Sequence, residues 1–184
     1  MLFRKLCLLL LGFLLSVKSY ADDRILKIEK GFGQASVNDL AYFIDSTNHL
    51  SFNYFLVIPE NRLKFSNQNL LNFDRHSFTY WLTFKVKNTG KEDLKDLILK
   101  LEDPFIDQAN CYIFDEKNTQ IYEGESGRLV PVEQKSIKSR FCEFRLDLPK
   151  NTNKTIVFKV TKAPSNYRLR FAARKYNFSH RQSI

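Results

Sequence analysis

Residues Tyr80 to Phe114 read YWLTFKVKNTGKEDLKDLILKLEDPFIDQANCYIF, and they contain three successive runs with the alternating pattern of β-strands. In the first run every second residue is apolar, and a strand turns such residues to one buried face. These residues are Tyr80, Leu82, Phe84 and Val86. Trp81 and Thr83 alternate with them and therefore belong to the opposite face. Three runs of this kind in succession predict three strands.

Turn-forming residues separate the three runs. Asn88-Thr89-Gly90-Lys91 has turn composition, and Gly90 is free to take a positive φ because it lacks a Cβ atom. Alternation then resumes at Leu97, Leu99 and Leu101. Pro104 ends the second run, since proline donates no hydrogen bond to a strand ladder. In the third run two faces are expected, one with Ala109, Cys111 and Ile113 and the other with Gln108, Asn110 and Tyr112.

The remainder of the chain also shows short strand-like runs at regular spacing. We expect an edge strand near Ile25 and Ile28 before Gly31-Phe32-Gly33, a strand or buried extended segment at 52–58, an irregular connection at 63–73, and strands at 119–123, 142–148, 156–160 and 167–171. Few helical runs interrupt them. This pattern predicts an all-β fold, a jelly-roll-like antiparallel β-sandwich of the kind found in carbohydrate-binding modules.

Eleven apolar residues are expected to form the core between the two sheets. They are Tyr80, Leu82, Phe84, Val86, Leu97, Leu99, Leu101, Phe144, Leu146, Ile156 and Phe158. All of them lie at the alternate positions of their runs that are apolar. A shift of one residue in the register of a strand would therefore turn all of its core residues to the solvent.

The first 21 residues have the features of a secretory signal peptide. Arg4 and Lys5 precede an apolar run, and Ser19-Tyr20-Ala21 offers the small residues that a signal peptidase reads. We expect cleavage before Asp22, export to the periplasm or beyond, and one domain over residues 22–184, which is long enough for a real core. An uncleaved membrane anchor is the alternative, although the apolar run is short for spanning a bilayer.

The charge of the chain is basic but dispersed. Loss of the signal peptide takes three residues, Arg4, Lys5 and Lys18, from the 29 Lys and Arg residues, and leaves 26 against 20 acidic residues, a net charge of +6. Lysines and acidic residues interleave along residues 85–102, which is typical of a solvated sheet face. We therefore expect no nucleic-acid partner. Dispersed positive charge of this kind fits attraction to an anionic surface better than nucleic-acid binding.

Two cysteines remain after cleavage, and both lie on the apolar parity of their strands. Cys111 and Cys142 are compatible with a disulfide in an oxidising compartment, or with two small buried apolar side chains. The three histidines, His49, His76 and His180, are scattered, so no metal site is expected. No cofactor-binding motif is present either, so we expect the protein to bind no cofactor.

Catalysis is the weaker interpretation of the acidic residues. Glu102, Asp103 and Asp107 lie close in sequence, and paired carboxylates can cleave glycosidic bonds. They flank Pro104, however, where carboxylates commonly solvate a turn or bind Ca²⁺. The chain also lacks a nucleophile elbow, a phosphate-binding glycine loop and a zinc-protease motif. We expect that the protein is not an enzyme.

Several short motifs occur in an order that is known from one family. Tyr80-Trp81 is an aromatic-Trp pair leading a strand that ends at Asn88. Pro104-Phe105-Ile106-Asp107-Gln108 then leads into a strand that contains Tyr112.

Further motifs lie on both sides of this stretch. Upstream, Tyr42-Phe43-Ile44-Asp45 is followed by Leu50, and downstream Gly127-Arg128-Leu129 precedes Arg140 and Phe144. Over about residues 35–162 the chain thus resembles the all-β extracellular sensory domain of bacterial seven-transmembrane receptors with diverse intracellular signalling modules, the type 2 extracellular domain. One departure is Thr83, since the family usually has a basic residue two positions after the Trp.

The resemblance implies an exported sensory module that binds a carbohydrate or similar small molecule and couples to a membrane signalling protein. In the family, seven transmembrane helices follow this domain, whereas here a basic, aromatic tail ends the chain. The expectation is either a standalone module with a membrane receptor as partner or a truncated receptor. The alternative is a structural or adhesive β-sandwich that binds no small ligand.

A ligand site is predicted on the face opposite the core. Trp81 is the only Trp in the chain, and sugar rings stack well on such a ring because their C–H groups meet its negative face. Asn110 and Tyr112 are expected on the same face, and Arg140 could add charge-assisted hydrogen bonds. Alternatively the irregular segment 24–78 covers Trp81, in which case Tyr112 is packing and Arg140 anchors a turn.

Overall fold

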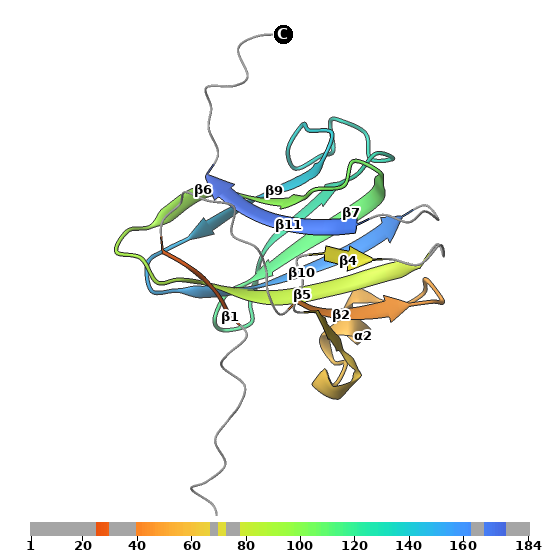
Figure 1. Cartoon of the computed structure of the whole chain (residues 1–184), viewed down its shortest axis with the longest axis horizontal. Helices are drawn as coiled ribbons and strands as arrows, with labels where there is room; N and C mark the ends of the chain where they lie inside the picture. Colours follow the sequence, from red (N-terminus) through yellow and green to blue (C-terminus); the bar gives the residue numbers. More distant parts are fainter. Residues whose placement is uncertain (1–24, 30–39, 67–69, 73–77, 163–167, 176–184) are drawn as a thin grey trace, which may run out of the picture.

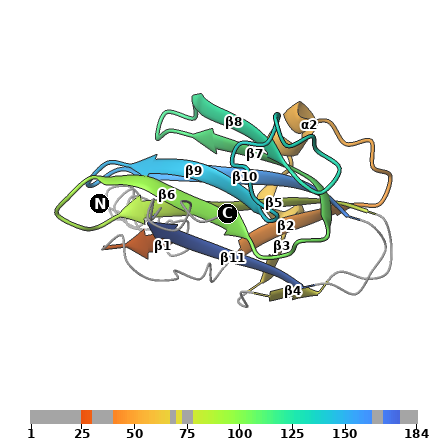
Figure 2. The same cartoon turned by 90° about the horizontal axis from the view of Figure 1, so that it is seen from above.

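The structure is a computed structural model that describes residues 25–29, 40–66, 70–72, 78–162 and 168–175. Two β-sheets lie face to face, as Figures 1 and 2 show. The all-β sandwich expected from the sequence is confirmed. The predicted signal peptide, the Gly31-Phe32-Gly33 break, Tyr167, His76 and His180 lie outside the described residues.

The larger sheet has seven strands. Its order is β3 (Lys64–Ser66), β2 (Leu40–Asp45), β5 (Thr79–Asn88), β10 (Asn153–Lys162), β7 (Ile106–Phe114) and β8 (Gln120–Ser126). The seventh strand, β1 (Ile25–Ile28), pairs in parallel with the end of β5 that β2 leaves free. β1 is thus an exception to the expected antiparallel pairing.

The smaller sheet has four strands. Its order is β4 (Leu70–Asn72), β11 (Arg168–Lys175), β6 (Leu94–Leu101) and β9 (Cys142–Leu148). All of its pairings are antiparallel. A register shift between Leu94 and Leu97 in β6 accompanies a positive φ at Asp96, as expected where a strand bulges.

The main core fills the space between the sheets and contains all eleven predicted core residues. Phe158 of β10 is fully buried at its centre, with its ring 6.2 Å from that of Phe84 and 5.5 Å from that of Phe144. The sequence register was therefore correct for β5, β6, β9 and β10.

The prediction for residues 52–58 was wrong. They form the short helix α2 (Phe52–Leu56), followed by the 3-10 helix η2 (Glu60–Arg62), and not a strand. The Ser51 hydroxyl caps α2 by accepting a hydrogen bond from the Tyr54 N–H at 3.2 Å. Figure 1 shows α2 on the side of the larger sheet that faces away from β6 and β11.

Two other segments also differ from the sequence expectation. The connection predicted at 63–73 contains the strands β3 and β4. The strand predicted at 119–123 is β8, which is longer than expected and continues through Gly124 to Ser126. A glycine inside a strand is tolerated where another chain segment approaches closely, and this is the case for Gly124.

The turn between β5 and β6 is present, but Gly90 does not have the positive φ expected of it. Gly90 is needed instead because a Cβ atom there would lie 2.1 Å from the Glu29 carbonyl oxygen. Asn88 organises the turn from a fully buried position: its Nδ2 donates to the carbonyls of Glu92 and Leu148, and its Oδ1 accepts from the Gly90 N–H. One side chain thus joins the β5–β6 turn to the end of β9.

Candidate functional site

The outer face of the larger sheet, turned away from the main core, brings together three of the four residues predicted to bind a ligand. Trp81 of β5 lies opposite Lys159 of β10, which in turn lies opposite Asn110 of β7. Tyr112 lies two residues further along β7, on the same face. The predicted sharing of one face by Trp81, Asn110 and Tyr112 therefore agrees with the strand register.

Of the two alternatives for Trp81, the structure shows the covered one: α2, which lies within the segment 24–78, covers the ring, so Trp81 is not an open platform. Its side chain is fully buried, and the ring of Phe55 stacks on the indole at 4.8 Å. Phe52 stacks on Tyr112 at 4.0 Å and lies 6.0 Å from Phe114. Together these rings and Val157 form an outer aromatic cluster, a second apolar cluster separate from the main core.

Asp45, at the end of β2, holds the loop that leads into α2. Its Oδ1 accepts hydrogen bonds from the Thr47 N–H, the Thr47 hydroxyl and the Asn48 N–H, at 3.0, 2.6 and 3.0 Å. Its Oδ2 accepts from the Leu50 N–H at 2.8 Å. Burial raises the pKa of this carboxyl, but the hydrogen bonds together outweigh burial and hold the pKa below its ordinary value.

Arg140, the fourth predicted ligand residue, does not join the other three. It is exposed in the loop before β9, and its guanidinium lies over the ring of the adjacent Phe141 at 4.6 Å. Parity arguments could not place Arg140, because it lies outside any strand.

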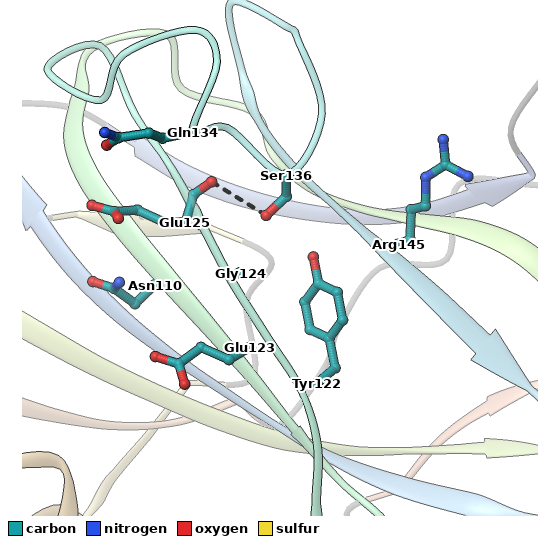
Figure 3. A pocket seen from close by; sticks show the side chains of 8 residues that line it. All are labelled: Asn110, Tyr122, Glu123, Gly124, Glu125, Gln134, Ser136 and Arg145. Carbon is teal, nitrogen blue, oxygen red and sulfur yellow. Dashed lines mark hydrogen bonds between the residues drawn. The ribbon is translucent and has the colours of Figure 1, made fainter.

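An open pocket of about 520 Å³ straddles β8, the edge strand of the larger sheet. Eight residues from β7, β8, β9 and the loop between β8 and β9 line it: Asn110, Tyr122, Glu123, Gly124, Glu125, Gln134, Ser136 and Arg145. Figure 3 shows the carboxylates of Glu123 and Glu125 and the amides of Asn110 and Gln134 on one side of β8. Tyr122, Ser136 and Arg145 lie on the other side.

The loop is fixed over β8 by hydrogen bonds to one carbonyl. The N–H of Ser136 donates to the Glu125 carbonyl at 2.9 Å, and its hydroxyl donates to the same oxygen at 3.2 Å (Figure 3). Gly124 allows this approach, because a Cβ atom there would lie 2.3 Å from the Ser136 hydroxyl and 2.4 Å from that of Tyr122. Burial raises the pKa of Tyr122, against the effect of its hydrogen bond with Ser136.

The pocket offers both acceptors and donors to a polar ligand. Glu123 is exposed, while Gln108 holds Glu125 in place by donating to its Oε1 at 2.6 Å. Amides and carboxylates arranged in this way can pair with several hydroxyl groups at once. Of the pocket residues, sequence reasoning found only Asn110, because the alternation of strand residues does not show where the loop after β8 adds Gln134 and Ser136 to the pocket.

The acidic residues considered for catalysis have structural partners. Glu102 forms an ion pair with Lys100 at 3.6 Å, and Asp103 accepts from the Phe105 N–H at 2.9 Å. Asp107 pairs with Arg128, whose backbone N–H also bonds to the Ile106 carbonyl. Within the described part of the chain, no group of three or more His, Cys, Asp or Glu residues is placed to hold a metal ion.

Cys111 and Cys142 are both free thiols buried in the main core. Burial raises the pKa of Cys142 to about 12 and that of Cys111 well above its usual range. Of the two alternatives that the sequence left open, the structure thus shows two small buried apolar side chains.

The comparisons with known proteins give one family. The sequence profile of the family 7TMR-DISM extracellular 2 matches residues 37–172, which is more than half of the chain. No curated protein matches. Among the described residues, no helix is long and apolar enough to cross a membrane.

Proposed function

Because the chain belongs to the 7TMR-DISM extracellular 2 family, the type 2 extracellular domains of seven-transmembrane receptors, we propose that this sensory module binds a carbohydrate or similar small polar molecule and couples to a membrane signalling protein. It acts as a binding module and not as an enzyme. In this proposal the chain is exported by its predicted signal peptide, cut after Ala21, and its sandwich works as a carbohydrate-binding-module-like jelly roll.

The open pocket on β8 is the observation that carries this proposal. A sugar presents several hydroxyl groups, and each is both a donor and an acceptor. Glu123 and Glu125 supply acceptors, while Asn110 and Gln134 supply both donors and acceptors. In small-molecule sites a few placed polar groups fix the orientation of the ligand.

Two of the family-like motifs, those that contain Asp107 and Arg128, stabilise the loop that forms part of this pocket. Asp107 is paired with Arg128 and accepts from the Leu129 N–H through its backbone carbonyl, which fixes the start of the loop after β8. That loop supplies Gln134 and Ser136 to the pocket. The ligand contacts themselves are expected to vary with the ligand of each receptor.

The test is calorimetric titration of the purified protein with a panel of neutral and acidic oligosaccharides. We expect one of them to bind. Glu123→Gln should weaken its binding by about tenfold or more, since a hydrogen bond to a charged group contributes about 1.5–3 kcal/mol, and Asn110→Ala should weaken it by about three- to tenfold, since a neutral hydrogen bond contributes about 0.5–1.5 kcal/mol. Glu92→Gln removes the same charge in the β5–β6 turn, far from the pocket, and should leave the affinity unchanged.

Two results would contradict the proposal. Binding that survives both pocket substitutions would place the ligand elsewhere. Failure of every oligosaccharide to bind would favour the alternative, a structural or adhesive sandwich without a small ligand.

A further inference from the structure

The cover over the outer aromatic cluster is thin. Of the five residues of α2, Phe55 alone is buried, while Tyr54 and Leu56 are 53% and 47% exposed. Phe52 and Phe55 hold the helix on the sheet by ring stacking on Tyr112 and Trp81.

The backbone of this cover is bonded to itself. The N–H groups of Phe55, Val57 and Ile58 donate to the carbonyls of Ser51, Tyr54 and Phe55. All of these bonds lie within residues 51–58, so α2 can leave the sheet as a unit without breaking a strand ladder. Segments held by few apolar contacts open at low free energy.

Beneath the cover lies a polar group that the fold does not use. The Trp81 indole Nε1 is buried and has no hydrogen-bond partner among the described residues. Buried donors are nearly always paired in native proteins, and an exception calls for an explanation. Lys159, directly opposite Trp81 in the neighbouring strand, places its ammonium 5.3 Å from the indole ring centroid.

We propose that α2 is a displaceable cover over a second binding surface, made by Trp81, Tyr112 and Lys159, which binds a flat ring carrying a carboxylate. The ring stacks on Tyr112 at the place that Phe52 takes in the closed state, beside Trp81. The carboxylate accepts from the Lys159 ammonium and from the indole N–H. This site uses residues other than those of the β8 pocket, so it does not depend on the function proposed above.

The cover sets the affinity of this surface. A ligand that binds only the open state has its apparent affinity reduced by the fraction of protein that is open. A substitution that weakens the cover without touching the surface below must therefore strengthen binding.

The experiment is calorimetric titration with benzoate, using benzyl alcohol as the uncharged probe with the same ring. We expect Phe52→Ala to bind benzoate on the order of tenfold more tightly than the unsubstituted protein. Tyr54→Ala, an exposed aromatic on the same helix, should bind like the unsubstituted protein. Adding Lys159→Gln to Phe52→Ala should remove the gain, and benzyl alcohol should bind more weakly than benzoate.

Three results would overturn the proposal: no gain in Phe52→Ala, an equal gain in Tyr54→Ala, or equal binding of the two probes. Glu123→Gln must leave benzoate binding intact, so loss of oligosaccharide binding and loss of benzoate binding are separate outcomes.

Hydrogen exchange on the unsubstituted protein gives a second measurement, which holds even if Phe52→Ala does not fold. The amides of Phe55 and Ile58 should exchange at least about a hundredfold faster than those of Leu82 and Phe158 in the sheet. Equal exchange rates would mean that α2 opens only by global unfolding, and the cover would then be a fixed part of the core.

Discussion

At the scale of single residues, two of the family-like positions, Asp45 and Asn88, hold loops in place by side-chain hydrogen bonds. Asp45 gathers four hydrogen bonds and fixes the approach to α2. Asn88 joins the β5–β6 turn to the end of β9. Neither side chain lines the pocket on β8. These residues therefore hold loops in place, and the ligand contacts that we propose lie at other positions.

Asp45→Ala should destabilise the protein by roughly 1–3 kcal/mol, because the amides of Thr47, Asn48 and Leu50 lose their acceptor. The same substitution should loosen α2 and shift the emission of Trp81, the only Trp, to longer wavelength in the native state. Urea denaturation and fluorescence measure the two effects. A loss of stability with unchanged native emission would mean that Asp45 does not position the cover.

The lowered pKa of Asp45 gives this contribution a pH dependence with a definite sign. Since the folded state favours the carboxylate, the stabilisation is present above the ordinary pKa of 3.8 and is lost as pH falls through the lower folded value. Asp45→Ala should therefore narrow the stability difference between pH 5 and pH 2 relative to the unsubstituted protein. If Asp45→Ala left the difference in the free energy of unfolding between pH 5 and pH 2 unchanged, Asp45 would not be the source of this pH dependence.

At the scale of elements, alternation identified the strands whose two faces differ. β5, β6, β9 and β10 each bury one parity in the main core, and the sequence shows it directly. α2 could not be found in this way, because a run of five residues with Phe52 and Phe55 turned to the sheet is too short to show a helical period. β3 and β4 have three residues each and show no period at all.

The loop after β8 gives a prediction at the same scale. Gly127 has a φ of +146°, and a Cβ atom there would lie 2.3 Å from the Asp107 carbonyl oxygen. Gly127→Ala should therefore destabilise the protein by roughly 1–3 kcal/mol. It should also displace the loop that carries Gln134 and Ser136, and weaken the oligosaccharide binding that we propose for the pocket.

Thermal unfolding and titration check both effects of Gly127→Ala. Gly90→Ala is the matched control. Gly90 lies in the β5–β6 turn, far from the pocket, and a Cβ atom there would also meet a backbone carbonyl oxygen, that of Glu29. Gly90→Ala should cost stability and leave the pocket's affinity unchanged. Equal effects of the two substitutions on binding would show that the pocket responds to stability in general.

At the scale of the whole molecule, the larger sheet is apolar on both faces over part of its area. Its inner face packs on the smaller sheet, and its outer face packs under α2. The sequence predicted that Trp81, Asn110 and Tyr112 share the outer face, because parity alone determines this. It also offered cover of Trp81 by the segment 24–78 as an alternative, but it could not show that a helix makes this cover, nor predict the β8 pocket, because both depend on segments that return from distant positions, 46–58 and 131–136.

The two faces of β5 allow a direct test of this arrangement with neighbouring residues. Phe84 is 6% exposed in the main core, whereas Lys85 is exposed on the opposite face. Phe84→Ala should reduce the free energy of unfolding by roughly 3–5 kcal/mol, since it removes a ring that packs near Phe158 and leaves a cavity. Lys85→Ala should change it by no more than about 0.5 kcal/mol. Urea denaturation followed by circular dichroism measures both, and a larger loss for Lys85→Ala than for Phe84→Ala would mean that the register of β5 is shifted by one residue.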